Sequence, residues 1–211
     1  YTSLTEILFS LVLIAAIYLF VSKRFIWSAV VISLIPFART EGVMFVILFI
    51  PALVWMKQYK SLPFLLAGFV CFSLLGLPFY HDFFWFFTQM PYTTDSSLLY
   101  GKGSFWYYFM EMDYMLNFPL LILTGTGFIY ILIHLKKGLK NLRDTRYVTL
   151  YFLIIPSIFG FILAQSFLWW RGMGILASTR FIACVLPLTA IIAVTGFDWV
   201  MEKARFSKLI Y

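Results

Sequence analysis

Seven apolar segments, separated by short polar ones, make up most of the chain. No ten-residue alternation of apolar and polar positions runs through them, and within lipid only helices and closed barrels satisfy every backbone polar group. The pattern therefore predicts seven helices. They cover residues 4–21, 25–37, 43–56, 62–80, 115–135, 147–170 and 181–200.

The composition places these helices in a membrane. Hydrophobic residues make up 63% of the chain and charged residues 12%, with a mean hydropathy of +0.93. A soluble domain has roughly 45–50% apolar and about 25% charged residues, so a water-soluble fold is excluded. A bilayer core needs roughly 20 apolar residues per crossing. We therefore expect an all-α integral membrane protein with about seven transmembrane helices in a single domain, residues 1–211.

The start of the chain gives a further expectation. It opens with Tyr1, and the first apolar segment has neither a basic leader nor a small-residue cleavage site, so it does not resemble a signal peptide. We expect the chain to be the C-terminal portion of a longer membrane protein.

Lysine and arginine gather in every second connection, at residues 23–24, 57–60, 136–146 and 203–208. The positive-inside rule assigns these connections to the cytoplasm. The alternate connections hold few cations and several carboxylates. The net charge of +7 thus follows membrane orientation and gives no reason to expect a nucleic-acid partner.

Two features of the non-cytoplasmic side are unusual. Segments 25–37 and 43–56 are about 20 Å long as helices, too short to cross, so their link 39–42 is expected below the membrane surface. A re-entrant hairpin would give the same topology. Residues 81–114 are crowded with aromatic side chains, which predicts an interfacial outer loop with one or two short helices.

The link 39–42 is the first candidate site. Thr40 is placed to cap the helix that begins near Gly42, and exposed amide groups beside the Arg39 guanidinium would receive a phosphate. Glu41 could balance Arg39 or hold a sugar hydroxyl. The alternative is an internal ion pair that only permits a short turn, although ionisable groups at membrane depth are usually functional.

The other candidates lie on the same side of the membrane. Arg180 starts the last helix and could bind a phosphate in bidentate fashion, whereas Arg171 could equally extend to lipid headgroups. His81 and Asp82 end the fourth segment, where Asp82 could be a general base or simply a solvated acid.

Motifs for other chemistry are missing from the sequence. There is no HExxH, no CxxC and no Walker loop, so no metal, nucleotide or other cofactor is expected. Gly125-Thr126-Gly127 lies within a helix and is better explained by close helix packing.

Three stretches resemble one family. ARTEGVMFVILFIPALVW, STRFIACVLPLTAIIA and GKGSFWYYFMEMDYMLNFPLLILTGTGFIYIL are similar to segments of the polytopic lipid-linked-sugar glycosyltransferases of the GT-C fold. That group includes protein O-mannosyltransferases and the aminoarabinose transferase of lipid A. The resemblance implies transfer of a sugar from a polyprenyl-phosphate donor to an acceptor on the non-cytoplasmic face, with Arg39 and Arg180 contacting the donor.

The resemblance also implies a catalytic carboxylate in the first outer loop, and no such segment precedes Leu4. We therefore expect the catalytic residue upstream of this chain. The alternative function is a transporter or flippase component, in which Arg39 and Glu41 between broken helices line a substrate path.

Overall fold

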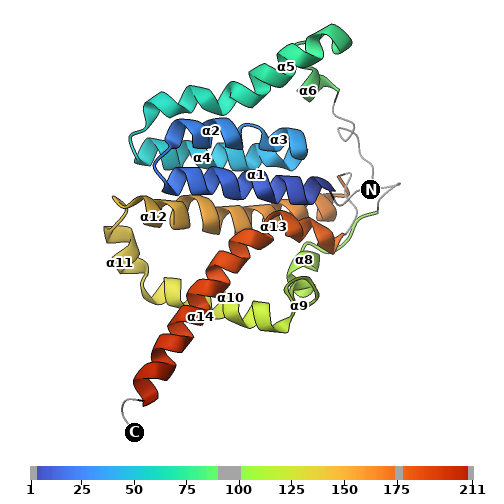
Figure 1. Ribbon diagram of the computed structural model, residues 1–211. Coiled ribbons are helices and arrows are strands. Elements are labelled where there is room, and N and C mark those ends of the chain that lie inside the picture. The colour runs from blue at the N-terminus through green and yellow to red at the C-terminus, as the bar shows by residue number, and fades with distance from the viewer. Residues whose placement is uncertain (1–3, 90–100, 174–177, 209–211) are drawn as a thin grey trace.

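The computed structural model describes residues 4–89, 101–173 and 178–208, the last four of these as backbone only. Every regular element within these ranges is helical (Figure 1). The α-helices are α1 (Leu4–Val21), α2 (Phe25–Ile32), α3 (Ile35–Ala38), α4 (Val43–Trp55), α5 (Ala67–Tyr80), α6 (Trp85–Thr88), α8 (Tyr107–Met110), α9 (Met112–Leu116), α10 (Phe118–Ile133), α11 (Leu135–Lys140), α12 (Thr145–Val148), α13 (Ile155–Arg171) and α14 (Leu186–Lys208). The remaining segments are the 3₁₀ helices η1 (Thr40–Gly42), η2 (Tyr59–Leu66) and η4 (Thr179–Cys184) and the π-helix η3 (Thr149–Ile154).

In the part of the chain that the structure describes, two helices are long and apolar enough to cross a membrane. One joins η2 to α5 over 22 residues, and the other joins α12, η3 and α13 over 27 residues. The apolar window of the first is only 22% buried within the protein, so most of its apolar surface faces outward. Leu75 and Phe79 of this helix face outward, as do Ile7 and Leu11 of α1. Such surface is rare on soluble monomers, and together with the two helices it indicates membrane association.

The predicted helix over residues 25–37 is present as one apolar helix over residues 25–38, but it has a break at Ser33 and Leu34 that the sequence analysis did not predict. Helix α2 ends before Ser33, and α3 begins two residues later with Pro36 in its first turn. The Ser33 hydroxyl donates to the Val30 carbonyl at 2.6 Å and accepts from the Gly68 amide at 2.8 Å. Pro36 has no N–H for the Ile32 carbonyl, so the break is expected on local grounds.

The prediction of close packing at Gly125-Thr126-Gly127 is confirmed at one of its glycines. Helices α10 and α14 cross with Gly127 against the Ile192 carbonyl and Gly196 against the Leu123 carbonyl, and a Cβ at either glycine would clash. A Cβ at Gly125 would meet nothing within 4 Å. The contact therefore depends on Gly127 and on Gly196, which the sequence analysis did not single out.

The basic connections gather at one end of the fold (Figure 1). The turn between α1 and α2, the end of α4, and helices α11 and α12 all lie there. The Trp55 indole N–H donates to the Leu142 carbonyl at 2.9 Å, and Lys23 contributes to the electrostatic field at Asp144. The start of α1 and helices α6, α8 and α9 lie toward the opposite end. The alternation of basic and acidic connections along the sequence thus corresponds to two ends in space.

Within its described residues, 81–89 and 101–114, the aromatic segment forms the short helices α6 and α8 and the start of α9, where the sequence predicted one or two short helices. Asp95 and Tyr100 lie outside the described residues. Phe37 of α3 stacks on Phe72 of α5 and contacts Phe86 of α6. These contacts hold α6 against α3 and α5.

Candidate functional site

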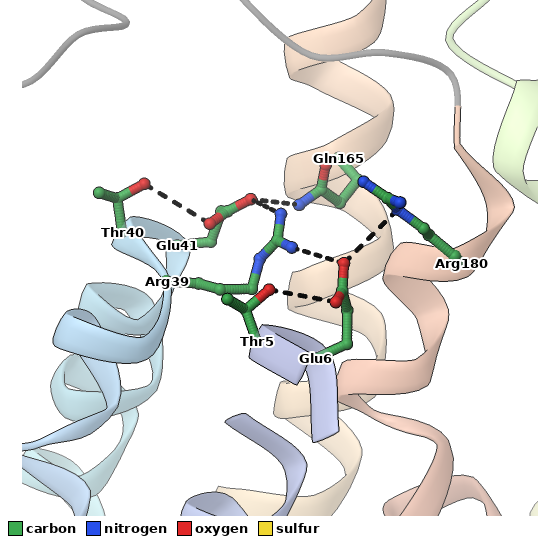
Figure 2. A network of polar contacts seen from close by, with 7 residues as sticks. All are labelled: Thr5, Glu6, Arg39, Thr40, Glu41, Gln165 and Arg180. Carbon is green, nitrogen blue, oxygen red and sulfur yellow. Dashed lines mark hydrogen bonds and ion pairs between the residues drawn. The ribbon is translucent and has the colours of Figure 1, made fainter. Parts of the chain in front are cut away.

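A buried cluster of charged side chains lies at the end opposite the basic connections (Figure 2). Arg39 is its centre: one guanidinium nitrogen donates to Glu6 Oε1 at 2.9 Å and another to Glu41 Oε1 at 3.0 Å. Glu6 comes from the first turn of α1, and its side chain is 4% exposed. Two carboxylates therefore share one guanidinium away from bulk solvent.

The backbone around Arg39 explains how one short link supplies both charges. Arg39 is extended (φ −155°, ψ 140°) between α3 and η1, so the chain reverses direction there. A Cβ at Gly42 would lie 2.7 Å from the Ile35 carbonyl carbon and 2.8 Å from the Pro36 nitrogen. Only glycine fits this approach, which folds η1 back against α3 and brings Glu41 beside Arg39.

Arg180, from η4, is the second cation of the cluster. Its Nε lies 3.6 Å from the same Glu6 Oε1 that binds Arg39. Phe181 contacts both guanidinium groups, with its ring centroid 4.5 Å from that of Arg39 and 5.7 Å from that of Arg180. The Arg180 side chain is 48% exposed and that of Arg39 only 15%. Arg180 is therefore the cation that a ligand reaches first.

Amide and hydroxyl groups complete the cluster (Figure 2). Gln165 of α13 is buried, and its amide nitrogen donates to Glu41 Oε1 at 3.3 Å. The Thr5 hydroxyl donates to Glu6 Oε2 at 3.1 Å, and the Thr40 hydroxyl lies 3.5 Å from Glu41 Oε2. The cluster thus joins α1, the link between α3 and α4, α13 and η4.

Several buried polar atoms of the cluster and of α13 and α8 have no hydrogen-bond partner among the described residues. They are Arg39 Nε, Gln165 Oε1, Ser166 Oγ, Trp169 Nε1 and Tyr108 Oη. Gln165 and Trp169 are one helical turn apart on α13, and Tyr107, next to Tyr108, places its ring 6.0 Å from that of Trp169. An unpaired buried polar group costs about 1–3 kcal/mol, so a group of them favours a place where a polar ligand binds.

An open groove begins at Arg180. It has a volume of about 210 Å³. Its lining residues are Tyr114, Met115, Thr179, Arg180, Ile182, Ala183 and Leu186. Arg180, Thr179 and Tyr114 supply polar groups, whereas the other four are apolar. The groove therefore offers a cation and an apolar wall side by side.

The structure brings together three of the six residues proposed from sequence, namely Arg39, Glu41 and Arg180. The other three have contacts within their own segments. His81 ends α5 in the left-handed conformation (φ 52°), and the Arg171 guanidinium lies 6.0 Å from the Trp170 ring. The Asp82 carboxylate accepts from the Thr88 hydroxyl and the Phe84 amide, which lower its pKa below the ordinary value.

The expected helix cap at Thr40 is wrong. Residues 40–42 form a 3₁₀ turn before α4, and the cap position of α4 is occupied by Gly42 without a side-chain hydrogen bond. The Thr40 hydroxyl is directed to Glu41 instead. The Glu41 carboxylate lies at this helix start and pairs with Arg39, which disfavours the anion receptor predicted there.

Glu6, Gln165 and Tyr108 are cluster residues that the sequence analysis missed. Glu6 carried a usable signal, because a carboxylate inside an apolar helix is expected to be functional. Gln165 is likewise a polar residue within a long apolar segment. Tyr108 gave no such signal, since it is one of many aromatic residues in its loop.

The fold and the cluster define an all-helical protein with membrane-length apolar helices and a buried site of paired charges. Comparison of the chain with protein-family models, curated proteins and solved structures finds no match.

Proposed function

We propose that this chain belongs to a multi-pass membrane glycosyltransferase that takes a sugar from a polyprenyl-phosphate donor on the non-cytoplasmic face. The observation that carries the proposal is the position of Arg180, which lies between the buried carboxylate cluster and the apolar groove. A lipid-linked sugar has the same order of parts: a polar sugar, an anionic phosphate and a long apolar tail.

The phosphate would bind at Arg180 rather than at Arg39. Arg39 already donates to two carboxylates at 3.0 Å or less and its side chain is 15% exposed, whereas the Arg180 side chain is 48% exposed and lines the groove. Guanidinium groups bind phosphate in bidentate fashion. The polyprenyl tail would then lie along Ile182, Ala183 and Leu186.

The sugar would lie toward α13, where polar atoms without partners are available. Gln165 Oε1 accepts hydrogen bonds, and Trp169 Nε1 and Tyr108 Oη donate them. Glu6 and Glu41 would hold Arg39 and Arg180 in place, since both carboxylates are engaged by guanidinium groups.

The topology that we propose has about seven crossings. It adds the shorter apolar helices to the two long ones and places the basic end in the cytoplasm. The cluster then faces the opposite compartment, where lipid-linked donors of this kind are presented.

One observation favours the rival transporter. The break between α2 and α3 and the turn at η1 place Arg39 and Glu41 beside discontinuous helices, a feature of substrate sites in secondary transporters. A transporter moves its substrate chemically unchanged, so donor consumption separates the two functions.

The test uses the full-length protein in vesicles with a radiolabelled polyprenyl-phosphate sugar and cell-envelope acceptors. We expect Arg180→Ala to reduce sugar transfer at least tenfold while the amount of folded protein is unchanged. Arg171→Ala is the matched control, because it removes the same group outside the cluster and is expected to keep wild-type transfer. Wild-type transfer by Arg180→Ala, or label crossing the vesicle unchanged, would overturn the proposal.

A further inference from the structure

A second concave surface lies at the basic end of the fold, on the turn between α11 and α12. Its volume is about 770 Å³. Its lining residues are Lys140, Asn141, Arg143, Asp144, Arg146 and Tyr147. This hollow is separate from the cluster around Arg39, which lies at the opposite end.

The hollow carries an excess of positive charge. The Asp144 carboxylate accepts from Arg146 twice, from its Nη2 at 3.1 Å and from its backbone amide at 2.9 Å, so the Asp144–Arg146 pair is neutral. Lys140 and Arg143 are exposed, and no ion pair between described residues includes either of them. Two cations therefore line the hollow without a carboxylate of their own.

The surroundings place the hollow at the level of lipid headgroups. Tyr18, Trp27, Trp55 and Tyr59 are exposed and belong to the helix ends on this side of the fold. Tryptophan and tyrosine concentrate at the membrane–water interface. The Trp55 indole donates to the Leu142 carbonyl, which fixes this aromatic residue directly to the hollow's own turn.

Exposed apolar side chains lie on the segment that precedes the hollow. They are Leu132 and Ile133 at the end of α10 and Leu139 within α11, next in sequence to Lys140 of the hollow. Lysines at 136, 137 and 140 lie on the same short stretch. Cations and exposed apolar side chains therefore occur together between the end of α10 and the hollow.

We propose that this hollow binds the phosphate headgroup of an anionic phospholipid. Lys140 and Arg143 would contact the phosphate oxygens, and the Asn141 amide and Tyr147 hydroxyl would bind the headgroup's hydroxyl groups. The acyl chains would lie against Leu139 and the end of α10. This inference does not depend on the glycosyltransferase proposal, because it concerns the other end of the fold and a lipid that is not consumed.

The test measures binding of short-chain lipids to the detergent-purified full-length protein by isothermal titration calorimetry. Dioctanoyl-phosphatidylglycerol is the probe, dioctanoyl-phosphatidylcholine tests the need for net negative charge, and inorganic phosphate tests whether a free anion suffices. We expect binding of phosphatidylglycerol, with phosphatidylcholine and inorganic phosphate each at least tenfold weaker.

Two double variants distinguish lipid binding in the hollow from general electrostatic attraction between the lipid and the basic end of the protein. Lys140→Gln with Arg143→Gln removes two cations that line the hollow, and Lys136→Gln with Lys137→Gln removes two nearby cations that do not. At about 1 kcal/mol per cation near a membrane surface, the first pair is expected to weaken phosphatidylglycerol binding by roughly 10- to 30-fold. The second pair should change it less than threefold. Equal losses in both pairs, or equal binding of phosphatidylcholine, would overturn the proposal.

Discussion

Arg39 Nη1 donates a hydrogen bond to Glu6 Oε1 at 2.9 Å, although 33 residues separate the two along the chain. The pair connects the first turn of α1 to the link before α4, and the same Glu6 oxygen contacts Arg180 of η4. Three segments that are distant in sequence therefore meet at one carboxylate oxygen. Glu6 thus links Arg180, whose side chain is half exposed, to Arg39, whose side chain is mostly buried. This difference in exposure separates the roles of the two arginines.

Removal of Arg39 should destabilise the fold. Glu6 and Glu41 would be left buried without their shared cation, and breaking a buried ion pair costs about 3–5 kcal/mol. We expect Arg39→Ala to lower the midpoint of thermal unfolding in detergent, measured by intrinsic tryptophan fluorescence.

Glu6→Gln is the control for that prediction. It keeps the size of the side chain and an oxygen acceptor, and Arg39 keeps Glu41 as its ionic partner. The loss of stability should therefore be smaller than for Arg39→Ala. Equal midpoints for wild type and Arg39→Ala would contradict the buried-pair argument.

Periodicity and charge predicted the helices well because both are local. The C-terminal ends of α1, α4 and α5 fall within a residue of the ends of the predicted segments. The start of the predicted segment 62–80 forms part of η2, and α5 begins at Ala67. The break at Ser33 has two causes. Pro36 is a local one, whereas the hydrogen bond from the Gly68 amide to the Ser33 hydroxyl is a tertiary contact that the sequence pattern does not show.

The site was only half predictable for the same reason. Arg39, Glu41 and Arg180 stand out as charges in apolar surroundings, so sequence identified them. Their arrangement also depends on the first turn of α1, which packs beside them and supplies Glu6, and the sequence does not specify that packing. Helix α13 contributes Gln165 to the cluster only because it packs beside the link before α4, and no pattern in the sequence specifies that packing.

The crossing of α10 and α14 gives a prediction on stability. Gly127→Ala places a methyl group against the Ile192 carbonyl, and overpacking of this kind costs typically about 1–3 kcal/mol. Gly125→Ala is the matched control, two residues away on the same helix with open space around it. Only Gly127→Ala should lower the unfolding midpoint. Similar midpoints for the two variants would show that the helices do not cross at Gly127.

The turn after α5 gives a prediction on pH. The Thr88 hydroxyl and Phe84 amide lower the Asp82 pKa, so their stabilising effect on the turn is complete above the ordinary pKa of about 3.9. It is lost as the pH falls through the lowered value. Thr88→Val should raise the Asp82 pKa toward the ordinary value, measured from its carboxyl carbon shift by NMR. Thr88→Ser keeps the hydroxyl and should keep the low pKa; an unshifted Thr88→Val titration would exclude this hydrogen bond.

The variant Tyr108→Phe tests whether the Tyr108 hydroxyl binds substrate or stabilises the fold. Its ring is fully buried, and its hydroxyl has no partner among the described residues. Tyr108→Phe keeps the ring and removes only the hydroxyl, so the folded protein loses no internal hydrogen bond. Removing an unpaired buried polar group is neutral or stabilising, by up to about 1–3 kcal/mol. We therefore expect an unfolding midpoint at or above that of the wild type.

The same variant should nevertheless weaken the reaction. If the hydroxyl binds the donor sugar, Tyr108→Phe loses one hydrogen bond to substrate, about 0.5–1.5 kcal/mol, and the KM for the lipid-linked donor rises roughly 2- to 13-fold. A buried tyrosine that only packs would leave KM unchanged, because its ring is retained. Unchanged KM with a raised midpoint would assign the unpaired hydroxyl to structure alone, and a lowered midpoint would mean that the hydroxyl has a partner within the protein.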